Sequence, residues 1–255
     1  MATRDDTFPL IGALRDAVLL SATVTEFEDL SPALRRIRFQ GPRLRGLSWQ
    51  AGQHIRIQVG GFAETLLRFH PHDALRAYSV YDADPVAGTL DIVRFEHDTE
   101  PETLTPSRRW ARDTGIGETV HFTRPQGNFV VRDDAPYHLF AGEETASVAF
   151  AAMLRSLPAG AEVHGVVEAA TAAGHLALPR GLTGVERGAG GAANSETLAA
   201  GLRALPLPDR PGVAYLAGEA RTIQRLRRIL IDERGWDRRA VRTKPFWTPG
   251  RTGME

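Results

Sequence analysis

Three residues within a four-residue stretch in the first half of the chain have side chains that could together hold a charged aromatic ligand. In the run "LRAYSVYDAD", Arg76 stands two residues before Tyr78, and Ser79 follows directly. Because residues two apart on an extended strand face the same side, Arg76 and Tyr78 can contact one ligand. A guanidinium offers forked donors to a phosphate, a phenol ring can stack on a planar ring, and a hydroxyl can hydrogen-bond its edge. Such a short pattern also occurs by chance, so the surrounding elements decide its meaning.

The elements around this stretch predict an antiparallel β-barrel. Short runs that alternate apolar and polar residues are separated by turn-rich pieces such as "QGPRLRG" and "DADPVAG". These runs span residues 17–27, 34–40, 53–59, 76–82, 88–97 and 118–124. Short period-two strands at this spacing are typical of an antiparallel barrel or sandwich. A short helix is expected near 107–113, where a serine stands in the N-cap position.

The second half of the chain alternates strands and helices, which predicts an α/β domain with a parallel sheet. We expect a barrel domain over 1–135 and an α/β domain over 136–255. The segments "HLFAGEETASVAFAAML" and "AYLAGEARTIQRLRRIL" both run from an apolar strand through Ala-Gly-Glu into a helix. A shared role in ligand binding and the ordinary geometry of a strand-to-helix turn explain this similarity between the two segments equally well. Residues 184–194 are expected to form a mobile loop, ahead of a helix capped by Ser195.

The composition is that of a globular protein with balanced charge. The 31 basic and 31 acidic residues cancel, which argues against a nucleic-acid-binding protein, and Lys244 is the sole lysine. Without cysteine there are no disulfides, thiolate metal sites or iron–sulfur clusters, so redox chemistry would need a bound cofactor. No signal peptide or membrane-spanning stretch is evident. We expect a cytoplasmic monomer that does not bind membranes.

Several other motifs favour ordinary structural roles. His70 and His72 in "FHPHD" have no further ligand at suitable spacing, so a loop is favoured over a metal site. Trp110 is expected to be a core residue rather than a cofactor contact. Lys244 is as consistent with a surface charge as with a ligand contact. No dinucleotide fingerprint or hydrolase elbow occurs in the right context.

A barrel followed by an α/β half is one arrangement that brings a flavin and a nicotinamide together. The sequence resembles the FAD-dependent siderophore-interacting proteins, which are ferric-siderophore reductases related to ferredoxin reductases. The resemblance rests on "TVTEFEDLSPALRRIRFQGPRLRGL", Arg-x-Tyr-Ser, "LDIVRFEHD", "TPSRRWARDTGIGETVHFTRPQGNF", "AGEETA", "KPFWTPG" and, most specifically, "YLAGEARTIQRLRRILIDERGWDRRAV". It implies a flavin-binding Greek-key barrel followed by a ferredoxin-reductase-like α/β domain.

The resemblance also implies roles for individual residues. Tyr78 and Ser79 would act at the flavin ring. The residues implied in holding FAD are Arg76, Tyr78, Ser79, Val80, Val93, His97, Thr105, Ser107, Trp110 and Thr145. Those implied near a nicotinamide are Gly142, Glu143, Glu144, Thr145, Ala217, Gly218 and Glu219. Those implied at a ferric siderophore are Arg242, Lys244, Trp247 and Arg251.

The chain departs from the family pattern at several of these positions. Tyr81 stands where relatives commonly carry a second arginine, and Asp98 stands where they carry a glycine. The residues 105–107 replace a Gly-Pro-Ala run, so the loop at the adenine end of FAD is expected to differ. Glu143 and Glu219 argue against tight binding of a nicotinamide phosphate, because a carboxylate at a helix start competes with an anion.

The implied activity is electron transfer from NADH, NADPH or a ferredoxin through FAD to a ferric siderophore. Reduction releases the metal, because hard oxygen donors hold Fe(III) far better than Fe(II). Two alternatives stay open. The protein could be a flavin oxidoreductase with another acceptor, for instance in secondary metabolism, or a module that binds siderophore without turnover.

Overall fold

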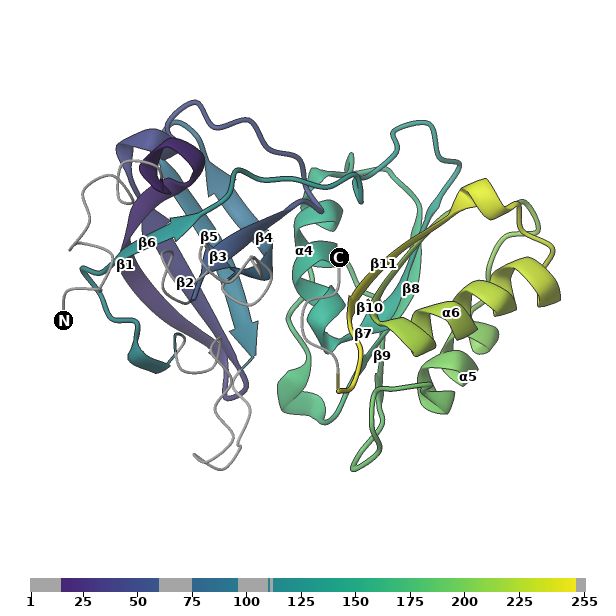
Figure 1. The fold of residues 1–255 in the computed structure, drawn as a ribbon. Coiled ribbons are helices and arrows are strands. Elements are labelled where there is room, and N and C mark those ends of the chain that lie inside the picture. The colour runs from purple at the N-terminus through teal and green to yellow at the C-terminus, as the bar shows by residue number, and fades with distance from the viewer. Residues whose placement is uncertain (1–14, 60–74, 96–109, 111, 251–255) are drawn as a thin grey trace. The chain divides into compact units, whose positions relative to one another are not determined.

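The structure is a computed structural model, which describes residues 15–59, 75–95, 110 and 112–250 (Figure 1). The chain divides into two compact units. The barrel unit comprises Met1–Leu30 and Leu34–Gly127, and the α/β unit comprises Ser31–Ala33 and Asn128–Glu255. Across the described ranges, no helix has the length and apolar character needed to cross a membrane.

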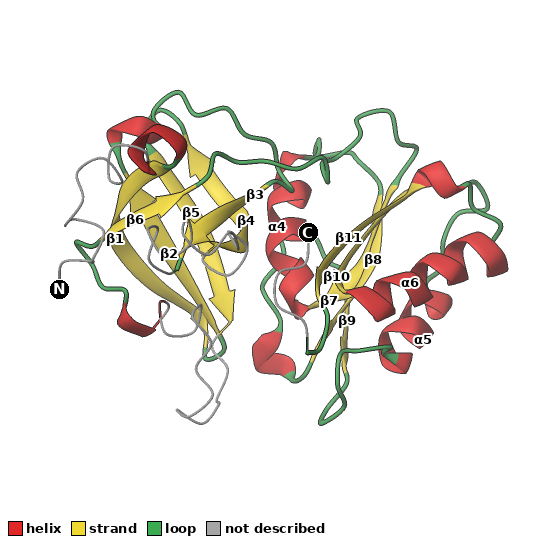
Figure 2. Ribbon diagram, viewed as in Figure 1, coloured by secondary structure: helices red, strands yellow, loops and turns green. Residues whose placement is uncertain are grey.

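The barrel unit is built on antiparallel strands that close in the order β1-β2-β5-β4-β3-β6 (Figure 2). The strands are β1 (Leu20–Ser31), β2 (Leu34–Gln40), β3 (His54–Gln58), β4 (Leu75–Asp84), β5 (Thr89–Phe95) and β6 (Thr119–Phe122). A short 3-10 turn, η2 (Pro42–Leu44), follows β2. The predicted antiparallel barrel is therefore confirmed.

Period-two alternation explains how these strands fill the barrel. Ile55 and Ile57 on β3, and Leu90 and Ile92 on β5, are all fully buried. Because successive side chains point to opposite faces, each such pair places two apolar groups in one core. They pack there with side chains from all six strands of the barrel, including Phe39.

The α/β unit contains a parallel sheet in the order β11-β10-β7-β8-β9. Its strands are β7 (His138–Glu143), β8 (Val163–Ala169), β9 (Thr183–Glu186), β10 (Val213–Glu219) and β11 (Val241–Trp247). Its helices are α4 (Ser147–Ser156), α5 (Glu196–Ala204) and α6 (Ala220–Arg228), with short turns η5 (Glu144–Ala146), η6 (Ala172–Gly174), η7 (Ile229–Glu233) and η8 (Arg238–Ala240). Helix α4 covers one face of the sheet, and α5 and α6 cover the other (Figure 1). The predicted parallel α/β architecture is confirmed.

Local sequence explains where two of these helices begin and which face they bury. Ser195 caps α5, since its hydroxyl accepts a hydrogen bond of 3.1 Å from the Leu198 amide. In α6, Ile223 and Leu226 lie on the sheet side and are buried, with arginines on the outer face. The helix continues into a π-turn, η7, and the chain then reverses at Gly235, whose φ is 70°.

One local expectation needs correction, since the first part of the predicted loop 184–194 belongs to β9, which pairs in parallel with β8. The sequence pattern does not predict β11, because an edge strand with polar and proline residues lacks a clear apolar alternation. Around the predicted helix 107–113, Trp110, Arg112 and Asp113 are helical, and the remaining positions lie outside the described residues.

Candidate functional site

Strand β4 changes its pairing partner halfway along its length. Leu75–Ser79 pairs with β3, whereas the registered pairing with β5 runs only from Val80 to Asp84. Among the described residues, the β5-side edge of Leu75–Ser79 therefore has no paired strand. Backbone groups at a strand edge can hydrogen-bond another strand or a ligand. This open edge carries the Arg-x-Tyr-Ser sequence.

A β-bulge marks the point at which β4 and β5 separate. Val80 is opposite Ile92 and Asp82 is opposite Asp91, so Tyr81 is the extra residue of the bulge. Up to this point Tyr78 and Val80 lie on the core-facing side of β4.

Arg76 and Tyr78 share one face of β4, as their spacing predicts. The Tyr78 ring packs at the margin of the barrel core, with its centroid 5.7 Å from the Trp110 ring. Burial raises the pKa of the Tyr78 phenol to about 12, and the charges of Arg94 and then Arg76 oppose that rise. The phenol is therefore neutral at ordinary pH and lies near two guanidinium groups. Trp110 has the core contact expected of it, and it also adds a second ring beside Tyr78.

Ser79 lies on the opposite face of the same strand. Its cross-strand partner is His54 on β3, so the two side chains are neighbours on one face. Gly127 is close to His54, since a Cβ at position 127 would lie 3.1 Å from the His54 Nδ1 atom. Sequence reasoning missed His54, and the alternation of "QHIRIQV" alone could not show which β4 residue it faces.

The other residues of the barrel unit predicted to contact the flavin lie in the barrel core, on β5 or outside the described residues. Val80 is fully buried in the barrel core, and its amide donates a hydrogen bond of 3.0 Å to the Gln53 carbonyl oxygen. Val93 is buried opposite Arg36 of β2, on the side of β5 away from Ile92. The predicted contacts His97, Thr105 and Ser107, together with Arg251 of the siderophore set, lie outside the described residues.

The two Ala-Gly-Glu turns of the α/β unit lie side by side on neighbouring strands. Ala217 of β10 is in register with Gly142 of β7, and a Cβ on Gly142 would come within 2.3 Å of the Ala217 carbonyl oxygen. Gly218 has a φ of 122°, and a Cβ there would lie 2.6 Å from Glu143 Oε1. Both glycines are thus required by close approach of the two turns.

Each glutamate of these turns caps the helical turn that follows it. Glu143 Oε2 accepts a hydrogen bond of 2.8 Å from the Thr145 amide, and Glu219 Oε2 accepts one of 2.9 Å from the Thr222 amide. Each carboxylate therefore occupies the positive end that an anionic ligand would use. The two segments could resemble each other through a shared ligand role or through turn geometry, and turn geometry accounts for these contacts.

Glu143 is a buried carboxyl group with an elevated pKa. Its Oε1 atom accepts hydrogen bonds from the Thr145 hydroxyl and from Trp247 Nε1, the latter at 2.9 Å. Burial and the neighbouring Glu144 charge raise the pKa of Glu143 to about 7, against the opposing effect of those hydrogen bonds. Glu143 can therefore gain or lose a proton near neutral pH.

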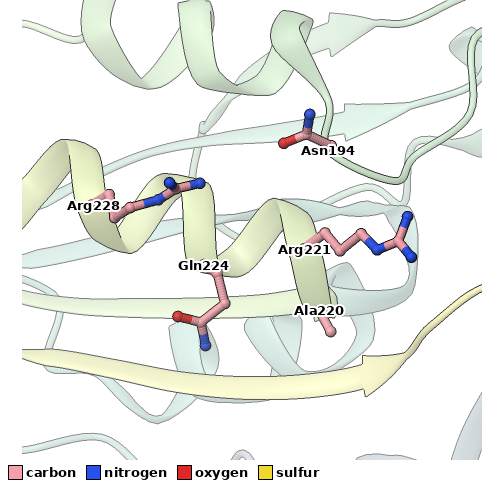
Figure 3. Close-up of a pocket in the computed structure, with 5 residues that line it drawn as sticks. All are labelled: Asn194, Ala220, Arg221, Gln224 and Arg228. Atoms are coloured by element: carbon pink, nitrogen blue, oxygen red, sulfur yellow. The ribbon is translucent and has the colours of Figure 1, made fainter.

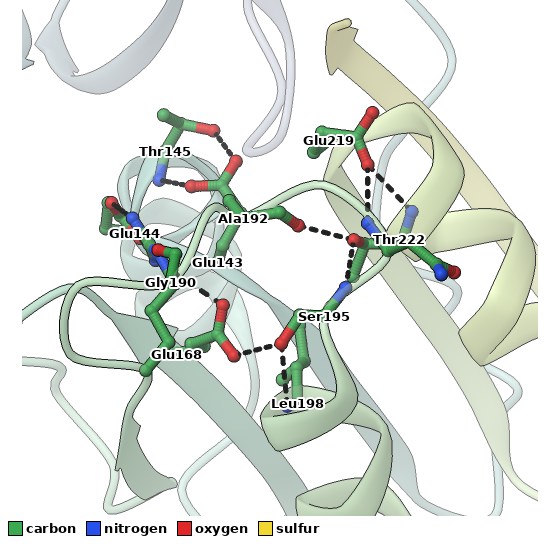
Figure 4. A network of polar contacts seen from close by, with 12 residues as sticks. Glu143, Glu144, Thr145, Glu168, Gly190, Ala192, Ser195, Leu198, Glu219 and Thr222 are labelled. Carbon is green, nitrogen blue, oxygen red and sulfur yellow. Dashed lines mark hydrogen bonds and ion pairs between the residues drawn. The ribbon is translucent and has the colours of Figure 1, made fainter. Parts of the chain in front are cut away.

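Four buried carboxylates gather at the carboxyl ends of β7, β8 and β10 (Figure 4). They belong to Glu143, Glu144, Glu168 and Glu219. Arg187 pairs with Glu144 and lies 3.4 Å from Glu168, which also accepts a hydrogen bond from the Ser195 hydroxyl. The described residues contain no group of three or more potential ligands arranged to hold a metal ion.

This acidic cluster contains most of the residues predicted at a nicotinamide. Gly142, Ala217 and Gly218 are buried beside the carboxylates, and Thr145 alone of the predicted set is half-buried. The arrangement disfavours a phosphate at the starts of α4 and α6, because Arg187 pairs with only two of the four buried carboxyl groups, Glu144 and Glu168.

A separate hollow of about 450 Å³ lies on the outer side of α6 (Figure 3). Its lining residues are Asn194, Ala220, Arg221, Gln224 and Arg228. None of the predicted nicotinamide residues belongs to it.

Edge strand β11 carries the described residues predicted at a siderophore. Arg242 and Lys244 are two residues apart and therefore share one face of the strand. Arg242 Nη2 donates a hydrogen bond of 2.7 Å to the Asn128 carbonyl oxygen. Trp247 instead donates to Glu143, so its polar atom is engaged within the unit.

Comparison with known proteins matches each half of the chain to a domain family of siderophore-interacting proteins. The family described as "Siderophore-interacting FAD-binding domain" matches residues 23–129, and that described as "Siderophore-interacting protein" matches residues 135–250. These matches support FAD as the cofactor of the barrel unit.

Solved structures show the same fold. A siderophore-interacting protein from Acinetobacter baumannii is 18% identical with a TM-score of 0.76, and 91% of each chain is covered. A siderophore utilization protein from T. fusca is 24% identical with a TM-score of 0.75, covering 93% of this chain and 95% of that one. The ferredoxin-NADP+ reductase of Plasmodium falciparum is 13% identical with a TM-score of 0.69, covering 89% and 96%. With a ferredoxin-reductase-like fold and both family domains in order, the chain belongs to the siderophore-interacting protein family.

Proposed function

We propose that this protein is a flavin-dependent reductase of ferric siderophores. Electrons would pass from NADH, NADPH or a reduced ferredoxin through FAD to a Fe(III) chelate, which then releases Fe(II). The observation that carries the proposal is the placement of Arg76 and Tyr78 on one face of β4, where its β5-side edge opens. Family membership makes FAD the ligand to which this edge is assigned.

The residues at the open edge suit FAD on chemical grounds. Tyr78 and Trp110 offer aromatic surface, and the guanidinium of Arg76 offers forked donors to a phosphate. Leu75–Ser79 pairs with β3, and no registered pairing with β5 is described for this part of β4, so we propose that a polar ring edge meets the backbone on that side. When bound, FAD accepts a hydride and passes electrons on one at a time.

The protein's part in the reaction is binding and orientation. Tyr78 stays a neutral phenol across physiological pH, so it can stack on a ring or donate a hydrogen bond without adding charge. Ser79 and His54 present polar groups on the other face of the strand. We assign Ser79 to the flavin edge through its backbone or hydroxyl.

The electron donor and the acceptor are assigned to the α/β unit. The carboxylates that cap the starts of η5 and α6 weigh against a dinucleotide phosphate at those turns, which leaves ferredoxin as a rival to NADH and NADPH. For the acceptor, we propose that Arg242 and Lys244 supply positive charge to an oxygen-rich, anionic ferric chelate.

The visible spectrum of purified protein tests this function. Flavin absorption bands are expected after reconstitution with FAD, and NADH, NADPH or reduced ferredoxin should bleach them under anaerobic conditions. Ferric catecholate and hydroxamate chelates are then added to the reduced protein. Reoxidation faster than that of free reduced FAD supports siderophore reduction.

Two outcomes would redirect the assignment. If every chelate reoxidises the bound flavin no faster than free reduced FAD, the protein is a flavin oxidoreductase with another acceptor. If the protein cannot be reconstituted with FAD yet retains ferric siderophore, it is a binding module without turnover.

A further inference from the structure

The hollow on the outer side of α6 carries polar side chains that the proposed electron transfer does not use (Figure 3). Arg221, Gln224 and Arg228 are three and four positions apart, so they share one stripe of the helix. Asn194, from the loop before α5, lies across the hollow from this stripe. The volume of about 450 Å³ is within the range of small-molecule sites.

The two arginines of this hollow are not neutralised by the protein. Within the described ranges, neither Arg221 nor Arg228 forms an ion pair or a side-chain hydrogen bond, and both residues are exposed. The neighbouring Arg225, by contrast, pairs with the carboxylate of Glu196. Two uncompensated guanidinium groups beside one concave surface attract an anion and can offer it forked donors.

The wall opposite α6 is anchored to that helix. Asn194 has a φ of 58°, in the left-handed region that asparagine tolerates better than most residues. Its carbonyl oxygen accepts a hydrogen bond of 3.1 Å from Arg225 Nη1, and its amide donates one of 3.4 Å to Glu219 Oε2. The hollow is therefore formed before a ligand binds, which lowers the entropic cost of binding.

A second hollow, of about 470 Å³, adjoins the first and shares Asn194 and Arg228 with it. Arg203 in this hollow is already neutralised, because it pairs with Glu233 at 2.6 Å. Asp232 also lines it, and among the described residues its carboxylate has no ion-pair or hydrogen-bond partner. The second hollow thus offers an acceptor to a hydroxyl group. It disfavours an acidic protein segment, whose carboxylates would meet those of Asp232 and Glu233.

The capping carboxylate of Glu219 does not compete for the first hollow. It is fully buried, it accepts the Thr222 amide within the first turn of α6, and it is not among the lining residues. A ligand in the hollow would be held by side chains of the outer face, whereas the amides at the helix start stay with Glu219.

We propose that the two adjoining hollows bind a sugar phosphate, either free or as part of a nucleotide. Arg221 and Arg228 hold the phosphate, Gln224 and Asn194 hydrogen-bond its remaining oxygens or the sugar, and Asp232 accepts a sugar hydroxyl. None of the residues assigned to FAD, to a nicotinamide or to a siderophore lines either hollow. The ligand is therefore not a reactant of the proposed reductase.

Isothermal titration calorimetry tests this site on protein saturated with FAD, so that the probes cannot enter the proposed flavin site. The probes are ribose 5-phosphate, AMP, ribose and inorganic phosphate. They are titrated into the wild type, Arg221→Ala, Arg228→Ala and Asp232→Asn. Arg239→Ala is the matched control, because Arg239 is an exposed arginine of the same unit that lines neither hollow. Circular dichroism verifies that each variant is folded.

The wild type is expected to bind ribose 5-phosphate and AMP, to bind inorganic phosphate more weakly and not to bind ribose. Arg221→Ala and Arg228→Ala should each lower the affinity for both sugar phosphates by about tenfold or more, since a lost charge-assisted hydrogen bond has an effect of that size. Asp232→Asn should weaken ribose 5-phosphate and leave inorganic phosphate unchanged, and Arg239→Ala should match the wild type.

The proposal is overturned if neither sugar phosphate binds, or if both arginine variants bind them as the wild type does. Inorganic phosphate binding as tightly as ribose 5-phosphate would also overturn it, because the hollows would then hold any small anion. If one arginine variant does not fold, the other decides.

Discussion

The indole of Trp247 donates a hydrogen bond of 2.9 Å from Nε1 to Glu143 Oε1, joining the last strand of the α/β unit to the end of its first strand. The contact crosses the intervening strand β10, whose Gly218 leaves room for the Glu143 side chain. A buried carboxyl group is thereby held in one position by groups from both ends of the domain.

The buried carboxyl of Glu143 should make the protein less stable as pH rises toward neutrality. Its pKa is about 7 in the folded protein against an ordinary value of 4.5, so the folded state holds the proton more tightly. Its favourable contribution is complete below about pH 4.5 and is lost as pH rises through 7. The loss is at most about 3.5 kcal/mol, because the two pKa values differ by about 2.5 units and each unit corresponds to about 1.4 kcal/mol.

Chemical denaturation between pH 5 and pH 8 measures this effect. Glu143→Gln should remove most of the decline in the free energy of unfolding, whereas Glu186→Gln, at an exposed glutamate of the same unit, should retain it. An identical pH dependence in Glu143→Gln and the wild type would show that Glu143 does not titrate in this range.

Gly218→Ala should destabilise the α/β unit by about 2–4 kcal/mol. The positive φ of Gly218 costs an L-residue about 1–2 kcal/mol, and the added methyl group would press against the Glu143 carboxylate. The free energy of unfolding is the measurement. Gly160→Ala is the control, because nothing lies within 4 Å of a Cβ at that position. Equal stability of the two variants would contradict the close approach of the two turns.

Tyr78 is expected to act through its ring rather than through ionisation. Tyr78→Phe should keep FAD affinity within about threefold, and Tyr78→Leu should lower it by about tenfold, because an aromatic contact contributes about 0.5–1.5 kcal/mol beyond its buried area. Fluorescence titration with FAD measures both. Tyr81→Leu, on the bulge, is the control variant. If Tyr81→Leu lowers FAD affinity as much as Tyr78→Leu does, the ring contact is wrongly assigned to Tyr78.

Lys244→Ala should slow reduction of anionic ferric chelates by about threefold or more and affect neutral chelates less, because surface charge mainly steers oppositely charged ligands. Stopped-flow reoxidation of the reduced protein compares the two chelate classes at low and high salt. Arg239→Ala serves as the control at an exposed arginine of the same unit. Equal slowing with both classes would leave Lys244 a structural residue.

Local sequence was sufficient to predict the barrel, the α/β sheet and the shared face of Arg76 and Tyr78. Each of these follows from a period of two or from the alternation of strand and helix, and such periods depend only on neighbours along the chain. The cap at Ser195 was predictable for the same reason, because a serine hydroxyl bonds an amide three residues away.

Tertiary structure alone decided which strand stands opposite which. The bulge at Tyr81 depends on the register between β4 and β5, and so does the approach of Arg94 to Tyr78. The burial of Glu143 and Glu219 depends on β7 and β10 lying side by side, although the two glutamates are 76 positions apart in the chain. From the sequence alone, these two glutamates could be charged groups that contact a ligand. In the fold each one caps the helical turn that follows it, because the two small-residue turns pack closely against each other and bury both carboxyl groups.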